Sequence, residues 1–153
     1  MNQSSQPKFG IERIYVKDVS FTVANAPEIY SDSRRYDVGI NINSTSRQVG
    51  EASFEVVLTV VATAKQGDNE VFKAIASEGG LFQIHNVQAA QLESILAIAC
   101  PNILLPYVRE VIADLSMRAG FMPVMLQPVD FESVYQQQKQ QAPSPLGQGV
   151  PVQ

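Results

Sequence analysis

Alternation of apolar side chains is clearest in Phe54-Glu55-Val56-Val57-Leu58-Thr59-Val60-Val61-Ala62, where every second residue, counted from the first, is apolar. A period of two places these residues on one face of a β-strand. The same period recurs from Tyr36 to Ile42. Two strands that share a buried face are therefore predicted in the first half of the chain.

A tight turn is predicted directly after these strands. Gln66-Gly67-Asp68-Asn69 has the residue types of a hairpin turn. It leads into a further strand, predicted over residues 70–77, whose alternate apolar residues from Phe72 to Ala76 continue the buried face. We expect Gly79-Gly80 to end that strand.

The first strand is predicted over Phe9 to Val23, with a change of phase inside it. Its apolar residues occupy even positions at Ile14 and Val16, then odd positions from Val19 onward. A slip of one residue predicts a β-bulge near Lys17-Asp18. Asn25-Ala26-Pro27 then marks the start of a connection, because proline cannot continue the ladder.

The second half of the chain changes to helical spacing. Apolar residues step by three and four from Leu92 to Ala99 and again from Val108 to Leu115, with Gly120 as a stop. Pro101 and Pro106 lie between the two sets. Proline removes a backbone donor and clashes with the carbonyl four residues earlier, so we expect a junction between two helices here.

A short last helix completes the predicted elements. Asp130 is the expected N-cap, and the helix should extend through Val134 and Tyr135. Strands followed by helices indicate an α+β fold. We predict a four-stranded antiparallel sheet, Greek-key-like with a crossover after the first strand, and helices packed on one face.

The two ends of the chain have little to bury. We expect residues 1–8 to form a mobile arm and residues 136–153, rich in Gln, Pro and Gly, to form a flexible tail. Residues 9–135 are then a single α+β domain.

Composition limits the class of protein and its compartment. The chain has 153 residues, 45% of them apolar, no Trp, and a formal net charge of -4 with a pI near 4.9. A chain without a basic stripe is not expected to bind nucleic acid. One cysteine allows no internal disulfide, no basic and apolar leader opens the sequence, and no uninterrupted apolar run approaches the ~20 residues of a membrane span. We expect a soluble cytoplasmic protein that does not insert into membranes.

Catalysis has little support among the residues. Cys100 and His85 are the only thiol and the only imidazole. No local pattern pairs the thiol with an orienting base, and one cysteine with one histidine cannot complete a zinc site. A cysteine in an apolar helical run is usually a small buried hydrophobe. We predict no enzyme activity, no metal and no cofactor.

The segment from Phe121 to Phe131 is unusually apolar for a linker. Pro123 and Pro128 prevent regular helix there. Methionine and aromatic side chains can repack around unlike partners, which suits a groove that accepts many sequences. The alternative is that the linker simply packs over the sheet. Val57 and Val61 also make the second face of their strand partly apolar, so we expect another subunit or a bound polypeptide to cover that face.

Four stretches resemble the SecB family of bacterial protein-export chaperones. The longest is Cys100-Pro101-Asn102-Ile103-Leu104-Leu105-Pro106-Tyr107-Val108-Arg109-Glu110. The others are 13–21, 107–118 and 128–131, in the family's order. The resemblance spans roughly residues 10–135 without a large gap.

The resemblance implies a chaperone of the bacterial cytoplasm that acts without nucleotide or cofactor. Members of this family form homotetramers as dimers of dimers, hold unfolded preproteins in apolar grooves, and pass them to the SecA motor of the translocase. Together with the apolar second face described above, the resemblance implies a set of client-binding residues on the crossover, one strand, the linker and the last helix. They are Ala26, Pro27, Ile29, Tyr30, Val57, Val61, Phe121, Met122, Val124, Met125, Leu126, Val129, Phe131 and Val134.

The SecA-docking face departs from the family pattern. Its positions fall at Asp18, Thr22, Lys73 and Ile75, and only Asp18 keeps its family character. Weaker attraction for a basic tail is therefore expected. Two alternatives stay open: a SecB-like chaperone with non-SecA partners such as a toxin-antitoxin system, and a non-catalytic oligomeric scaffold whose apolar linker is only core.

Overall fold

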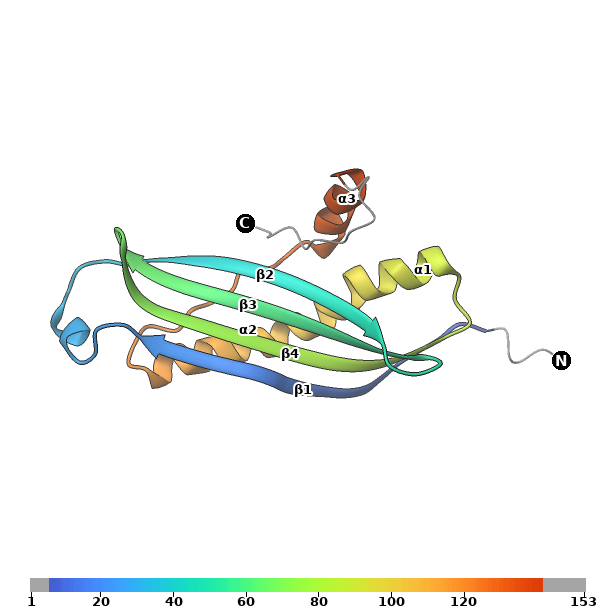
Figure 1. Cartoon of the computed structure of the whole chain (residues 1–153), viewed down its shortest axis with the longest axis horizontal. Helices are drawn as coiled ribbons and strands as arrows, with labels where there is room; N and C mark the ends of the chain where they lie inside the picture. Colours follow the sequence, from blue (N-terminus) through green and yellow to red (C-terminus); the bar gives the residue numbers. More distant parts are fainter. Residues whose placement is uncertain (1–5, 142–153) are drawn as a thin grey trace.

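The computed structural model describes residues 6–141, which form one four-stranded antiparallel sheet with a long helix along one face (Figure 1). The strand order is β1-β4-β3-β2, so the chain crosses from one edge of the sheet to the other between β1 and β2. This confirms the predicted α+β fold. The elements are β1 (Lys8–Val23), the 3-10 turn η2 (Glu28–Ser31), β2 (Asp37–Gln48), β3 (Ser53–Gln66), β4 (Asn69–His85), α1 (Ala89–Ser94), the π turn η3 (Ile95–Ala99), α2 (Cys100–Arg118) and α3 (Phe131–Gln141).

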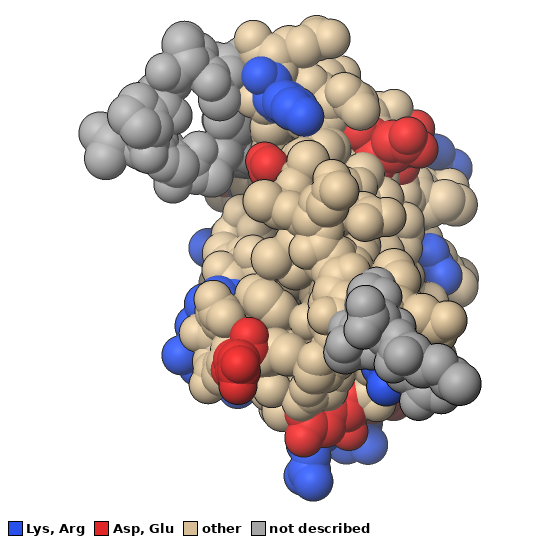
Figure 2. Space-filling view, turned by 90° about the vertical axis from the view of Figure 1, so that its right-hand side faces the viewer, with Lys and Arg blue, Asp and Glu red and all other residues tan. Residues whose placement is uncertain are grey.

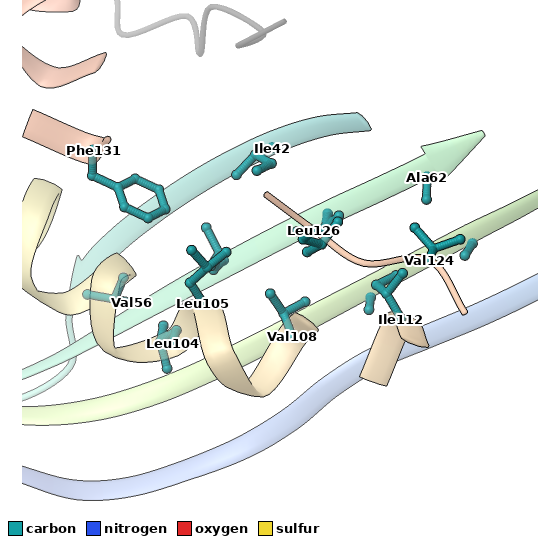
Figure 3. Close-up of a cluster of buried hydrophobic side chains, with 14 of the residues drawn as sticks. Ile42, Val56, Ala62, Leu104, Leu105, Val108, Ile112, Val124, Leu126 and Phe131 are labelled. Carbon is teal, nitrogen blue, oxygen red and sulfur yellow. The ribbon is translucent and has the colours of Figure 1, made fainter. Parts of the chain in front are cut away.

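The inner face of the sheet, which we define as the face that α2 covers, carries the core. Alternate residues of β3 from Phe54 to Ala64 are buried there, as the period of two predicted. Helix α2 contributes Leu104, Val108 and Ile112, all fully buried, and these side chains point toward the sheet (Figure 3). Replacing one such leucine by alanine would cost about 2–5 kcal/mol.

Strand β4 is longer than the sequence predicts. It passes through Gly79 and Gly80 and ends at His85. The glycines do not end the strand, because each admits a neighbouring side chain instead. A Cβ at Gly79 would lie 2.5 Å from the Tyr15 ring, and one at Gly80 would lie 2.5 Å from the Phe82 ring. Real Cβ atoms do not tolerate such approaches, so glycine is required by packing.

Strand β1 contains the predicted bulge. Val16 pairs with Glu78 and Asp18 pairs with Ser77, which leaves Lys17 as the extra residue. A second bulge, which the apolar pattern did not reveal, lies between Ile11 and Arg13. The bulges keep the apolar residues of β1 on the inner face on both sides of each slip.

The two predicted helices are one continuous helix over residues 89–118, so the predicted junction at the prolines is wrong. The π turn η3 precedes Pro101, and the Cys100 N–H donates to the Ile95 carbonyl five residues earlier. The wider turn relaxes the contact between the proline ring and the preceding carbonyls. Pro106 lies inside α2.

This helix has the length and apolar composition of a membrane span. The core helix of a soluble protein passes the same test, and one side of α2 is packed on the sheet.

Helix α3 stands beyond the β2 edge of the sheet (Figure 1). Asp130 caps it as predicted: its Oδ1 accepts from the Ser133 N–H at 3.1 Å and its Oδ2 accepts from the Ser133 hydroxyl at 2.7 Å. The helix continues to Gln141, past the predicted boundary at residue 135. Residues 1–5 of the expected arm and 142–153 of the expected tail lie outside the described residues.

We expect Gly79→Ala to lower the free energy of unfolding by about 1–3 kcal/mol, because the Tyr15 ring must move. In a Tyr15→Ala background the same change should cost almost nothing, since alanine loses less backbone entropy than glycine on folding. Denaturant unfolding of the four proteins of this cycle measures the coupling.

Gly39→Ala is the matched control for this cycle, because a Cβ there would meet only the Thr63 carbonyl, at 3.9 Å. Equal costs of Gly79→Ala with and without the Tyr15 ring would contradict the packing argument.

Candidate functional site

An open groove of about 830 Å³ lies between β2, the linker and α3. Tyr36 and the inner-face side chains of β2 from Val38 to Ile42 form one side, and linker residues 122–129 run along it. Asp130, Ser133, Val134 and Gln137 close it from α3. Most of these side chains are apolar, so the groove suits an apolar guest.

Two polar contacts fix the linker to α2. The buried Ser116 hydroxyl accepts a hydrogen bond from the Val124 N–H at 2.9 Å, and it lies within donor distance of the Ile112 and Ala113 carbonyls. The Arg109 side chain donates to the Leu126 carbonyl at 3.2 Å. These contacts satisfy backbone groups of a segment that belongs to no helix or strand. The linker is thereby held as a defined wall.

The side chains of the linker divide into two sets. Val124 and Leu126 are only 8% and 5% exposed and join the core, and Figure 3 shows them on the linker, beside α2 and over the sheet. Met122 and Met125 are 78% and 63% exposed. Methionine adapts its shape to its neighbours. The groove therefore has adaptable side chains on a fixed wall.

An aromatic cluster borders the groove at Tyr36. The Phe121 ring lies 4.8 Å from the Phe72 ring and 6.0 Å from the Tyr36 ring, measured between centroids. Tyr30 packs on Phe121 at 5.4 Å, and its hydroxyl donates to the Ala119 carbonyl at 2.6 Å. Gly120, with φ +90°, makes room for the Tyr30 ring. The cluster ties the crossover after β1 to the end of α2.

The predicted client-binding residues fall into three places. Those of the linker and α3 lie on the groove, except that Phe131 is core and Phe121 belongs to the aromatic cluster. On the crossover, Tyr30 lies beside Phe121, and Ala26 and Pro27 are exposed outside the groove lining. Val57 and Val61 point to the opposite, outer face of the sheet, so they cannot line this groove.

The outer face carries a network centred on Glu55, which sequence reasoning missed. Glu55 is 6% exposed and accepts from the Tyr15 hydroxyl, from Lys17 Nζ at 2.9 Å and from Arg47 Nε at 2.9 Å. The Tyr15 hydrogen bond, with Lys17 and Arg47, lowers the pKa of Glu55 to about 2, against the effect of burial. Burial and then the Glu55 contact raise the pKa of Tyr15 to about 12.

The residues of the predicted docking face lie together on this outer face. Thr22 pairs with Lys73, and Asp18 pairs with Ser77 two residues past Ile75 on β4. Asp18, Thr22 and Lys73 are exposed and Ile75 is half-buried. The register therefore brings these residues together across β1 and β4.

The thiol and imidazole offer no reactive centre. Cys100 is fully buried, and burial raises its pKa to about 12, so it stays a thiol at neutral pH. His85 is exposed at the end of β4. Residues 6–141 contain no group of three or more His, Cys, Asp or Glu residues able to hold a metal.

The end of the molecule at which α1 lies is mostly uncharged. In Figure 2, Lys, Arg, Asp and Glu lie mainly around the margin of this end. No broad patch of a single charge sign is visible there, so electrostatic steering of a partner to this end would be weak.

Comparison with known proteins gives consistent matches. The family model described as "Preprotein translocase subunit SecB" matches residues 2–142. A protein-export protein SecB of Dechloromonas aromatica is 49% identical over 154 residues and covers 100% of both chains. That of Nitrosospira multiformis is 48% identical over 140 residues, covering 92% of this chain and 88% of its own.

The fold is also similar to that of a solved structure. It is a SecB-like chaperone of Mycobacterium tuberculosis in complex with a peptide from an antitoxin, with a TM-score of 0.66 and 19% identity. The match covers 79% of this chain and 90% of the other. At this identity the likeness concerns the fold.

The Glu55 network predicts a stability that depends on acid pH. The pKa of Glu55 is about 2 when folded, against about 4.3 in an unfolded chain, so the unfolded state binds more protons between these values. The free energy of unfolding should therefore fall as pH drops from about 5 to about 2. Glu55→Gln should lower stability at pH 7 by about 1–3 kcal/mol and flatten this decline.

Denaturant titrations from pH 2 to pH 7 measure both effects, with Glu51→Gln, an exposed glutamate on the β2–β3 connection, as the matched control. An equally steep acid decline in Glu55→Gln would show that other groups cause it.

Proposed function

Because the chain belongs to the SecB family of protein-export chaperones, we propose that it is an ATP-independent holdase that binds unfolded preproteins in its groove. The observation that carries this proposal is the open apolar groove, with exposed methionines on a wall fixed by Ser116 and Arg109. A groove whose side chains adapt their shape, without specific recognition of one sequence, suits many different clients.

In this proposal the predicted residues have different roles. Met122, Met125, Val129 and Val134 line the groove without being buried, so they would touch a client directly. Val124, Leu126 and Phe131 are core residues that hold the wall in place. Tyr30 and Phe121 would extend the apolar path past Tyr36.

Many shallow contacts explain both holding and release. An unfolded client loses conformational entropy wherever it is held, so useful affinity must come from repeated weak contacts along a long path. Each contact removes apolar surface from water and involves no chemical step. Binding and release of clients therefore require no nucleotide.

Assembly into a homotetramer, a dimer of dimers, is part of the proposal. The inner face of β1 leaves an apolar stripe uncovered, since Phe9, Ile11, Val16 and Val19 are exposed beside the buried core. Further copies of the chain that cover this stripe would remove apolar surface from water. Four grooves on one particle would then lengthen the binding path for a client in the bacterial cytoplasm.

Delivery to SecA through the outer face is the remaining step of the proposal. Asp18 is the one exposed carboxylate kept at a docking position, and Lys73 lies on the same face with the opposite charge. Glu55 adds little attraction for a basic tail because Lys17 and Arg47 already engage it. Docking should therefore be weak and sensitive to salt.

We expect Met125→Asp to weaken binding of an unfolded client about tenfold, because each arriving apolar segment must desolvate the new carboxylate. The fold and assembly should persist, since Met125 is exposed. Suppression of aggregation of an unrelated refolding protein, without nucleotide, measures the activity, and light scattering checks the assembly.

Val49→Asp is the matched control, because Val49 is also an exposed apolar residue and lies on the β2–β3 connection, away from the groove. Phe131→Asp should instead unfold the protein, as Phe131 is buried. Full client binding by a folded Met125→Asp variant would mean that clients bind outside the groove, and absence of client binding by the unchanged protein would favour the scaffold alternative.

The double change Thr22→Glu, Ile75→Glu should raise affinity for SecA or its isolated tail at low salt, because added carboxylates at the exposed Thr22 and the half-buried Ile75 increase the attraction for a basic partner. Most of the gain should vanish at high salt. Calorimetry at two salt concentrations measures both effects.

Asn43→Glu, Thr45→Glu adds the same charge to the β2 side of the outer face and serves as the control. If the unchanged protein binds SecA tightly and its affinity does not change with salt concentration, SecA uses another surface.

A further inference from the structure

The chain leaves α3 next to the groove. The capping residue Asp130 and Ser133, Val134 and Gln137 of α3 line the groove, and the helix ends at Gln141. Four helical residues rise only about 6 Å. The last described residue of α3 therefore lies close to the groove.

The sequence of that segment has the chemistry of a groove ligand. Residues 142–153 read Ala-Pro-Ser-Pro-Leu-Gly-Gln-Gly-Val-Pro-Val-Gln and contain no charged side chain. Leu146, Val150 and Val152 offer apolar groups at intervals. Its three prolines oppose helix and favour extended backbone, the form in which a chain exposes most side-chain surface.

The lining suits an uncharged occupant. Asp130 is the one ionised residue among the described lining residues, and the Ser133 amide and hydroxyl already occupy it. Entry of this segment would therefore bury no charged side chain of its own, and Asp130 would keep its hydrogen bonds to Ser133. Gln127 and Gln137 remain at the lining as hydrogen-bonding groups for an extended backbone.

The segment is also long enough. Twelve extended residues span up to about 40 Å. Returning along α3, whose 11 residues are about 16 Å long, uses about five of them. The rest can lie beside the linker. A short tether gives an effective concentration in the millimolar range, so even weak contacts would be substantially occupied.

We infer that residues 142–153 bind in the groove of their own protomer and compete with clients for it. This inference rests on the proposed function of the groove and adds its regulation. A client must displace the segment to bind, and the segment reoccupies the surface as a client leaves. Polypeptides that offer only a short apolar stretch would therefore fail to displace the segment. Long unfolded polypeptides, which make many contacts, would displace it and stay bound.

The first test observes the groove without any client. Methyl-labelled methionine gives separate NMR signals for Met117, Met122 and Met125 in the full chain. The triple change Leu146→Ser, Val150→Ser, Val152→Ser should shift the signals of Met122 and Met125 toward those of a chain truncated after Gln141. Met117, on α2 outside the groove lining, should not respond.

The triple change Ser144→Ala, Gln148→Ala, Gln153→Ala is the matched control and should leave the groove signals as in the unchanged chain. Methionine signals that are the same in the full, truncated and triple-serine proteins overturn the inference.

The second test measures competition. Reduced and carboxymethylated lactalbumin with a fluorescent label is the unfolded probe. Its affinity should rise about 2- to 10-fold in the triple-serine variant, the range expected for losing a weak tethered competitor, and stay constant in the control. Unchanged probe affinity overturns competition. Absence of probe binding in all variants overturns the proposed function instead, while the methionine signals still decide whether the segment occupies the groove.

Discussion

Close approach of side chains to β4 at Gly79 and Gly80 is the constraint on which both faces of the sheet depend. On the inner face, the space above Gly80 is filled by the Phe82 ring, with Leu104 of α2 3.0 Å from where a Cβ would be. On the outer face, the Tyr15 ring lies over Gly79 and its hydroxyl reaches Glu55. A side chain at either position would push α2 or Tyr15 away from the sheet.

The groove follows from how α2 ends. The helix sits on β3 and β4, and its last turns present Arg109 and Ser116 to the backbone of the linker. The linker then runs beside β2 as an ordered wall, although it forms no helix or strand itself. In the proposed function, fixing the backbone while leaving Met122 and Met125 exposed separates stability from recognition. The wall is rigid, and the surface it offers is adaptable.

On the outer face, the electrostatic effect of a carboxylate depends on whether basic side chains are paired with it. The sequence alone does not distinguish Glu55 from the other acidic residues of the chain. In the structure it is buried under Tyr15, Lys17 and Arg47, so it stabilises the sheet and contributes little field to an approaching partner. Asp18 stays exposed and Lys73 opposes it. The potential of this face is therefore set by which carboxylates remain unpaired.

Periodicity in the sequence was sufficient for the strands around Phe54–Ala62, the bulge at Lys17, the Asp130 cap and the α+β class, because each depends on neighbours within a few residues. Local reasoning failed at Gly79-Gly80 and at the prolines of the long helix, where packing and a π turn override propensity. The composition of the linker revealed that it is apolar, but nothing in the local sequence predicts that Val124 is buried and Met125 is exposed. Only the tertiary structure decided which of them is buried, through contacts with Ser116 and Arg109 from a distant part of the chain. The partners of Glu55 lie 8 to 40 residues away in sequence, so strand register alone brought them together.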